Sequence, residues 1–432
     1  MRVKFLQKVL DILRGKRCKK HNLKYFEKLQ NDFNLKLKNL SKKYKNGQKI
    51  KVAFLFMYST SIQNLCIFDE MLKSDIFDPY FIVNPDVYRS KDNFDYNYKR
   101  TKQELIKKYG KERVLDGYDY ENEKFIDYTH LFDMATSNNP YDIMAHKYFK
   151  VSYWGAKKIP MFYISYFYMG RCYVTINNFK IEESNYLWKF FAENNGVLDI
   201  AKEYQILKGK NIIVTGYPKM DKLNDIKISK NTDDKKLVII APHHTIDDSD
   251  TSVGSFLEYY DIIKELPRKY SRIIFVFRPH PMLIENLNTK YWGKEKTKNY
   301  IKELTSNENV IYSTEGDYLE LFAKSDALIH DCGSFSAEYF YTGKPCAYMF
   351  KKNLKPDLIW TDFGRKCINL HYSIKKSQDL YTFIDNVVLK GEDPLQKKRE
   401  DFASKEIKIN YPHSTDKIME ELSNAIKGII ND

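Results

Sequence analysis

Ile273-Ile274-Phe275-Val276-Phe277-Arg278-Pro279-His280-Pro281 is the stretch that decides the fold of this chain. Its apolar residues predict a strand buried on both faces, and the polar residues that follow mark the strand's carboxyl end. The same pattern of an apolar run followed by polar residues occurs in Asp326-Ala327-Leu328-Ile329-His330-Asp331-Cys332-Gly333-Ser334. A helix-like segment follows it. In open parallel α/β sheets, ligands bind beyond the carboxyl ends of the strands. The two stretches therefore predict a parallel α/β domain with a ligand site at their ends.

Strands and helices alternate through the second half of the chain. Apolar runs predict strands at 237–241, 272–278, 309–312, 326–331 and 346–350. Helices are predicted between them at about 255–269, 316–324 and 334–342. Strands that alternate with helices are joined by right-handed crossovers and form a parallel sheet.

The first half shows the same alternation and predicts a second Rossmann-like domain. Its predicted strands are 51–57, 80–83, 131–135 and 161–165. The stretch 211–218 marks the start of the second domain, and the amphipathic segment 413–429 is predicted to pack back on the first half. The expected organisation is an arm at 1–50, Rossmann-like domains at 51–210 and 211–395, and a terminal helical segment at 396–432.

Length, cysteine use and hydropathy favour an enzyme of the cytoplasm. The 432 residues suffice for two domains with cores of their own. The six cysteines include no CxxC pair and no metal-ligand spacing, which favours reduced thiols. No apolar run reaches the ~18 residues that a membrane span requires. Charged residues interrupt the N-terminal apolar positions, so no signal peptide is predicted.

The N-terminal arm carries almost all of the net charge. Residues 1–50 contain 16 Lys+Arg and 3 Asp+Glu, which gives +13 of the formal net charge of +14. Leu6, Val9, Leu10 and Leu13 fall on one face of a helix that basic residues surround. The pattern predicts binding to an anionic membrane surface, and the alternative is a solvated helix whose apolar face packs on the protein body. Nucleic acid is not an expected partner, because aromatic and arginine residues are not interleaved here.

Histidines, hydroxyl groups and a Gly-Ser pair recur where the predicted strands of the second half end. If these strands are neighbours, their ends open into one crevice for a nucleotide-activated donor. A Gly-Ser helix start lets main-chain amides approach a phosphate, and a histidine beside it can hydrogen-bond or protonate that phosphate. The predicted catalytic residues are His280 and His243, and the predicted donor-binding residues are Arg278, His244, Ser313, Thr314, Asp331, Gly333, Ser334 and Glu338.

The carboxylates near this crevice receive separate interpretations. Glu338 lies one helical turn after Ser334 and is placed to accept hydrogen bonds from ribose or alcohol hydroxyls; the alternative is an ordinary exposed helix carboxylate. Asp331 is expected to cap the following helix rather than to act as a base. Asp247-Asp248-Ser249-Asp250 has the ligand type of a metal site, but acidic loops are more often solvated. No cofactor is predicted, and no metal is expected to be essential.

The second half resembles the bacterial CDP-glycerol glycerophosphotransferases of the teichoic-acid-polymerase type. Their Arg-x-His-Pro strand end is matched by 278–281, and their Asp-Tyr-Ser-Ser-x-x-x-Asp junction by 331–338. The Gly343-Lys344-Pro345 turn also agrees. The resemblance implies a GT-B fold, in which two Rossmann-like domains face a cleft and the second holds the donor. It also implies that His280 and Ser334 contact the donor pyrophosphate and that Glu338 replaces the family's aspartate.

The first half departs from this family at the residue that should act as the base. Family members often carry a Trp-His-Gly motif whose histidine is regarded as the general base. Here the comparable stretches, 160–166 and Tyr153-Trp154-Gly155, contain no histidine. Tyr163, Tyr166 and Asp142 are the remaining candidates, and each has a structural alternative.

The resemblance implies in-line attack of an acceptor hydroxyl on the β-phosphorus of a CDP-activated alcohol, with release of CMP. His280 would stabilise or protonate the leaving phosphate. The expected acceptor is a cell-surface polysaccharide or lipid-linked glycan, and the expected location is the inner face of the cell membrane, as a peripheral protein. Two alternatives stay open: a GT-B glycosyltransferase with a nucleotide-sugar donor in capsule or lipopolysaccharide synthesis, and an inactive scaffold of the same fold.

Overall fold

The structure, a computed structural model, describes residues 21–429 apart from 89–90, 227, 229–234 and 315. It divides into two units, each built round a parallel sheet. The first unit takes the described residues up to Tyr166, together with Val174–Asp221 and the residues from Ile409 onward. The second takes Phe167–Tyr173 and Lys222–Lys408. The α/β class and the two Rossmann-like sheets predicted from the sequence are confirmed.

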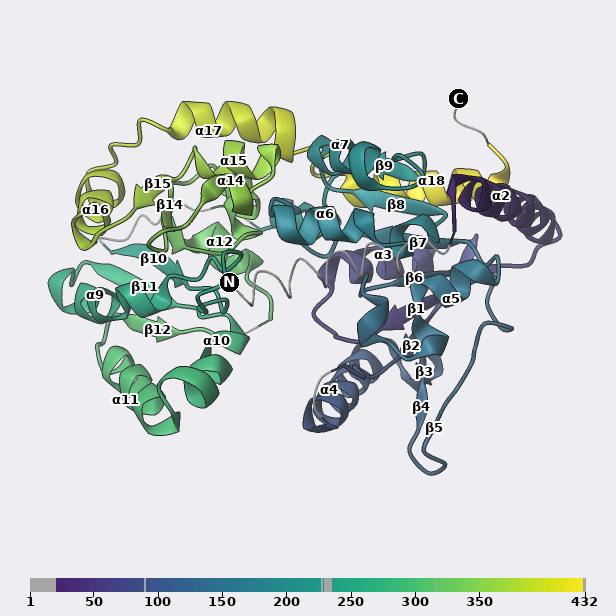
Figure 1. Cartoon of the computed structure of the whole chain (residues 1–432), viewed down its shortest axis with the longest axis horizontal. Coiled ribbons are helices and arrows are strands. Elements are labelled where there is room, and N and C mark those ends of the chain that lie inside the picture. The colour runs from purple at the N-terminus through teal and green to yellow at the C-terminus, as the bar shows by residue number, and fades with distance from the viewer. Residues whose placement is uncertain (1–20, 89–90, 227, 229–234, 315, 430–432) are drawn as a thin grey trace. The chain divides into compact units, whose positions relative to one another are not determined.

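The sheet of the first unit has seven parallel strands in the order β3-β2-β1-β6-β7-β8-β9 (Figure 1). The central strand β1 is buried at every position except Lys51, as its apolar sequence predicts. A separate hairpin, β4–β5, joins Tyr118–Asp119 to Lys124–Phe125. The seven strands are β1 (Ile50–Phe56), β2 (Phe77–Val83), β3 (Val114–Asp116), β6 (Met134–Ser137), β7 (Met161–Ile164), β8 (Lys189–Ala192) and β9 (Ile212–Val214).

Helices follow most of these strands and cover the sheet. The described helices of this unit are α2 (Leu23–Lys45), α3 (Ile62–Lys73), α4 (Lys91–Tyr109), α5 (Val151–Ala156), α6 (Cys172–Lys180), α7 (Asn195–Tyr204), α8 (Pro218–Asn224) and α18 (Ser414–Lys427). Two of them, α6 and α8, have residues on both sides of a unit boundary. Among the helices that the structure describes, none combines the length and apolar character needed to cross a membrane.

The predicted arm at 1–50 is wrong in its second part. Helix α2 buries Phe26, Leu29, Phe33, Leu37 and Leu40, so it belongs to the core of the first unit. It packs against α18, and the two helices lie side by side in Figure 1. Residues 1–20, with the apolar stripe predicted to bind membranes, lie outside the described residues. Only that part is left as the predicted arm.

The predicted boundary at 211 is also wrong, because β9 belongs to the first sheet. β9 pairs with β8 in parallel, and the first unit runs on to Asp221. The predicted terminal segment 396–432 divides between the units, since α17 (Gln396–Phe402) belongs to the second unit and α18 to the first. The prediction that 413–429 packs on the first half is confirmed by the contacts of α18 with α2 and α3.

The second sheet has six parallel strands in the order β12-β11-β10-β13-β14-β15. All five strands predicted in this half are present, and β15 was not predicted. The strands are β10 (Lys236–Ala241), β11 (Ile273–Phe277), β12 (Val310–Tyr312), β13 (Ala327–His330), β14 (Cys346–Met349) and β15 (Tyr372–Ile374). The helices that bear on the site are α9 (Phe256–Lys269), α10 (Pro281–Asn286), α12 (Leu319–Lys324), α13 (Phe335–Glu338) and α15 (Asp362–Ile368).

Candidate active site at the carboxyl edge of the second sheet

The parallel register brings the predicted strand ends to one edge of the second sheet. β10 lies between β11 and β13, so His243, Arg278 and Asp331 follow neighbouring strands. Ser313 follows β12, which lies next to β11. The Arg278 guanidinium donates to the Ser313 hydroxyl at 2.7 Å and lies over the Tyr318 ring, 5.4 Å from its centre.

Three histidines gather at this edge, two after β10 and one after β11. The ring centres of His243 and His244 are 4.3 Å apart, as are those of His244 and His280, and those of His243 and His280 are 5.3 Å apart. Burial, followed by the charges of the other histidines and Arg171, holds the pKa of His243 well below its ordinary value. The His243 ring is therefore neutral at physiological pH. The fold brings together the two histidines predicted to be catalytic and His244.

Main-chain N–H groups fix the tautomer of two of these rings. Met282 N–H donates to Nδ1 of His280 at 3.1 Å, where His280 is the N-cap of α10. Nδ1 of His243 accepts from the main-chain N–H of Thr245 at 3.3 Å and lies 2.9 Å from the Thr245 hydroxyl. A neutral imidazole has one accepting and one donating nitrogen. Because Nδ1 accepts in both rings, Nε2 is the nitrogen that carries the proton and can donate.

This arrangement suits an oxyanion better than a metal ion. A metal-bound histidine donates its second ring N–H to a carbonyl or carboxylate and binds the ion through its bare nitrogen. In His243 and His280 the main chain donates to the ring instead. Within the described part of the chain, only the three-histidine cluster, with ring nitrogens within 4.8 Å of one another, has the spacing to hold an ion. The expectation that activity needs no metal stays a prediction.

Asp331 has a structural position in this unit, and its assignment as a donor-binding residue stays a prediction. It is fully buried, and its carboxylate accepts the main-chain N–H of His243 at 2.5 Å and of Ser255 at 2.6 Å. The Ser255 hydroxyl adds a third bond at 2.9 Å. Burial raises the pKa of Asp331 to about 7, although these donors act to lower it. Asp331 joins the loop after β10 to the start of α9, and it does not cap α13 as expected.

The predicted helix start at Gly333-Ser334 is shorter than expected. α13 has four residues and continues as a 3-10 turn, Tyr339–Thr342, so it supplies little of the axial dipole that was expected to hold a phosphate. The Ser334 hydroxyl lies 3.5 Å from the sulfur of Cys332. Thr314, predicted with this group, is exposed at the end of β12.

Glu338 is buried, so the alternative of an ordinary exposed helix carboxylate is wrong. Its side chain is 1% exposed, and the hydroxyl of Tyr318 donates to its Oε2. The Tyr318 ring also lies under the Arg278 guanidinium. Glu338 therefore helps to position Arg278 indirectly, through Tyr318. It positions Tyr318, and its contact with the donor stays a prediction.

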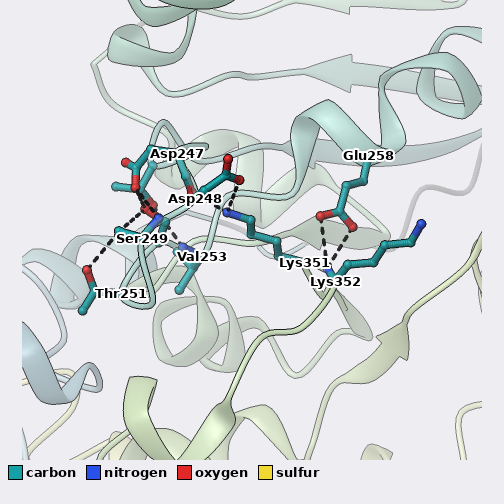
Figure 2. A network of polar contacts seen from close by, with 10 residues as sticks. Asp247, Asp248, Ser249, Thr251, Val253, Glu258, Lys351 and Lys352 are labelled. Carbon is teal, nitrogen blue, oxygen red and sulfur yellow. Dashed lines mark hydrogen bonds and ion pairs between the residues drawn. The ribbon is translucent and has the colours of Figure 1, made fainter. Parts of the chain in front are cut away.

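The acidic loop after β10 is bonded within itself, as Figure 2 shows. Asp247 Oδ1 accepts from the main-chain N–H of Ser249 at 2.9 Å and from the Ser252 hydroxyl at 2.6 Å. Burial acts to raise the pKa of Asp247, but these bonds hold it at about 2. Lys351 donates to the main-chain carbonyl of Asp247 and lies 3.8 Å from the Asp248 carboxylate. The loop is therefore held in place by Lys351 and by its own hydrogen bonds.

Arg171 is a residue of this edge that sequence reasoning missed. Its guanidinium donates to the carbonyl of Thr251 in the acidic loop. Its side chain also crosses Gly333, where an added Cβ would lie 2.8 Å from Cδ of Arg171. Nothing in the sequence signals this neighbourhood, because Arg171 precedes the second sheet and is brought to it only by the fold.

Two of the candidates for the general base in the first unit are structural. Asp142 accepts the main-chain N–H of Val151 at 2.6 Å at the start of α5, and burial raises its pKa. Tyr163 lies inside β7, where burial raises its pKa well above the ordinary value. Tyr166 is more exposed, and its hydroxyl lies 3.1 Å from that of Tyr141. Of the three, Tyr166 has the most accessible hydroxyl.

Residues 171–355 match a family model described as CDP-Glycerol:Poly(glycerophosphate) glycerophosphotransferase. The matched segment holds every residue predicted for the site, from His243 to Glu338, and begins at Arg171. This segment is glycerophosphotransferase-like. The resemblance found in the strand ends at 278–281 and 331–338 is confirmed. A sequence comparison with curated proteins gave no match.

Solved structures of two kinds share the fold. The wall teichoic acid polymerase TagF has a TM-score of 0.55 and 15% identity over 99% of this chain and 99% of its own. A UDP-N-acetylglucosamine 2-epimerase has a TM-score of 0.56 and 15% identity over 89% of this chain and 98% of its own. The enzyme of this name from Neisseria meningitidis, bound to UDP-GlcNAc, matches at 0.56 and 15% over 87% and 100%. At these identities the likeness shows the GT-B-type fold alone.

Proposed function

We propose that the glycerophosphotransferase-like protein moves glycerol phosphate, or a similar phospho-alcohol, from a CDP-activated donor to a hydroxyl of a cell-surface polysaccharide or lipid-linked glycan. The observation that carries the proposal is the coincidence of the matched segment, 171–355, with the histidine cluster and its neighbouring strand ends. TagF, which shares the fold, has been solved after a soak with CDPG. Teichoic acid or capsule synthesis is the process in which such an acceptor is built.

The reaction is an in-line displacement at the β-phosphorus of the donor. The acceptor oxygen forms a bond to this phosphorus, the bond to the bridging oxygen breaks, and CMP leaves with that oxygen. The acceptor proton passes to a base that is not assigned. Such chemistry depends on positioning and on neutralising charge at the phosphates.

Two imidazole N–H donors fit the task at the leaving phosphate. The Nε2–H groups of His280 and His243 are donors, and their tautomers are fixed before a ligand arrives. Donors that are already oriented toward developing charge stabilise a transition state without reorganisation. His280 is assigned to the leaving CMP phosphate because its capping bond also fixes its ring to the start of α10.

A nucleotide screen tests the donor class. The full chain is incubated with CMP, UMP, UDP and GDP, and thermal stabilisation is measured for each. CMP is expected to stabilise most, and CDP-glycerol with an acceptor glycan is expected to release CMP. A preference for UDP, the nucleotide of the fold-sharing epimerases' substrate, would instead indicate a nucleotide-sugar transferase. Stabilisation by none of them would indicate a scaffold.

Membrane attachment through residues 1–20 belongs to the same proposal. Attraction of about 1 kcal/mol per basic residue near an anionic surface suffices for reversible binding when several act together. Deletion of residues 1–20 should abolish sedimentation with anionic liposomes and keep a folded protein, because α2 with its buried Phe26 and Phe33 is retained. A deletion that extends to residue 45 removes α2 and should destabilise the first unit. Liposome binding that survives the shorter deletion would place the anchor elsewhere.

A further inference from the structure

The segment Phe167–Tyr173 belongs to the second unit, although β7 and most of α6, which flank it, belong to the first. Hydrogen bonds from Thr361 hold this segment in place. The main-chain carbonyl of Gly170 accepts the Thr361 N–H at 2.9 Å and the Thr361 hydroxyl at 3.1 Å. Arg171 forms an antiparallel bridge with Trp360. The backbone that carries the Arg171 side chain is therefore fixed beside the loop that leads into α15.

Two glycines make room for this segment. An added Cβ at Gly364 would lie 2.2 Å from the carbonyl oxygen of Gly170, so only glycine permits the close approach of the two chains. An added Cβ at Gly333 would lie 2.8 Å from Cδ and 3.2 Å from Cγ of Arg171. The aliphatic part of Arg171 thus lies across the bare main chain of Gly333, which is the first glycine after β13.

The charge of Arg171 has no carboxylate partner among the described residues. Its guanidinium donates to the neutral main-chain carbonyl of Thr251. Its Nε is buried without a hydrogen-bond partner in the described part of the chain. The charge is felt nearby, since it contributes to lowering the pKa of His243. The guanidinium thus combines a positive charge with an unpaired Nε–H donor. Together with histidines whose Nε2–H groups can donate, it forms an environment for an anion.

We propose that Arg171 is a ligand of the donor's diphosphate and works with the Nε2–H groups of His243 and His280. The proposal rests on the proposed function and adds to it a positively charged group that the strand-end residues do not supply. A guanidinium binds phosphate oxygens through paired N–H donors, and its charge is permanent at any working pH. Arg171 therefore supplies charge to the diphosphate at pH values where His243 is neutral.

The test compares Arg171→Gln and Arg171→Lys with the wild-type enzyme. Inhibition by inorganic pyrophosphate and by CMP is measured, together with kcat and KM for CDP-glycerol. Arg171→Gln should lower kcat/KM by about 10²-fold, the scale for one lost charge-stabilising donor, and should weaken pyrophosphate inhibition more than CMP inhibition. Arg171→Lys should recover part of the loss, because it keeps the charge without the fork. Arg268→Gln is the matched control and should behave as wild type. It makes the same charge change in the last turn of α9, at the end of that helix far from Ser255.

Gly333→Ala supplies a second variant that leaves the arginine in the sequence. The new methyl group displaces the Arg171 side chain, so pyrophosphate inhibition should weaken in this variant as well. In an Arg171→Gln background, Gly333→Ala should add little further loss, because the two changes act on the same contact. Fully additive losses would show that Gly333 does not act through Arg171.

The outcomes separate the two proposals. A wild-type enzyme that neither binds CMP nor releases it from CDP-glycerol overturns the proposed function. A wild-type enzyme that is active, combined with unchanged kinetics and pyrophosphate inhibition in Arg171→Gln, overturns the role of Arg171 alone. If Arg171→Gln does not fold, the folded Arg171→Lys and Gly333→Ala variants decide by the same measurements.

Discussion

The carboxylate of Asp331, at the end of β13, accepts the main-chain N–H of His243 at 2.5 Å, at the end of β10. Its other oxygen accepts from Ser255, the residue before α9. One buried side chain thus fixes the backbone from which the His243 ring projects. A buried carboxylate therefore holds the main chain that carries His243.

Asp331→Asn is expected to destabilise the second unit by about 1–3 kcal/mol, the range for a buried donor left unsatisfied. The amide offers one accepting oxygen, so a main-chain N–H of His243 or Ser255 must face an NH2 group. The free energy of unfolding from denaturant titration measures this. Asp326→Asn makes the same change at the residue before β13. Its effect on the free energy of unfolding shows whether the loss is specific to the carboxyl end of the strand. Equal stability of Asp331→Asn and wild type would contradict the bonding described here.

His280→Asn separates the capping and donor roles of this residue. Asparagine is a good N-cap, so α10 should keep its start, whereas the Nε2–H donor is lost. Turnover of CDP-glycerol should fall by ~10²-fold or more, the scale of one lost donor to developing charge, with little change in melting temperature. His280→Ala should lose both properties. Wild-type turnover in His280→Asn would remove His280 from the chemistry.

His371 should make the fold sensitive to acid. Burial lowers the pKa of His371 to about 3. Between pH 6.5 and 3 the unfolded chain binds a proton at His371 and the folded chain does not. The contribution of His371 to the free energy of unfolding is therefore complete above pH 6.5 and is lost as the pH falls toward 3. The loss is about 1.4 kcal/mol per pH unit. Measured at pH 7 and 5, wild type should lose stability relative to His371→Phe; parallel losses would contradict the buried neutral state.

Lys351→Met should loosen the acidic loop without unfolding the unit. The Lys351 amine bonds the main chain at Asp247 and lies near the Asp248 carboxylate. Hydrogen exchange at 247–253 should accelerate several-fold, and the KM for CDP-glycerol should rise, because this loop also accepts the Arg171 guanidinium. Lys352→Met is the matched control, since Lys352 bonds Glu258 through its main-chain N–H. Similar exchange in both variants would show that the loop does not depend on Lys351.

Activity should persist in excess chelator. The main chain donates to Nδ1 of both His243 and His280, which is the reverse of the arrangement that metal-bound histidines adopt. Turnover is measured after dialysis against EDTA and again after Mg²⁺, Mn²⁺ or Zn²⁺ is added. Complete loss with recovery on one of these ions would assign a metal to the cluster or to the donor phosphates.

The strands that carry the site could be predicted because each is a short apolar run with a polar end. Alternation with helices predicted that the strands are parallel, and the structure supplies the order that places the ends with His243, Arg278 and Ser313 along one edge. Asp331 was misread because an aspartate before Gly333-Ser334 has the pattern of a helix cap. Only the fold shows that Ser255 and His243, far from it in sequence, donate to its carboxylate.

The errors at the domain boundaries have physical causes as well. β9 has only three residues, and its strand pairing with β8 cannot be read from an isolated Ile212-Ile213-Val214. The arm was judged by its charge, which hid the apolar face of α2 at Phe26, Leu29 and Phe33. Arg171 gave no local signal, because its neighbours come from the loops after β10 and β13.

The assignment of Phe167–Tyr173 to the second unit bears on how the chain can be divided. A contiguous fragment of residues 222–408 would contain the whole second sheet but would lack the strand partner of Trp360. It would also lack the Gly170 carbonyl, which accepts from Thr361 and lies against Gly364. It would also lack Arg171. Domain-swapped chimeras cut at Asp221 would therefore exchange the sheet of one protein for that of another while they keep the original arginine, and donor preference in such hybrids would follow both parents.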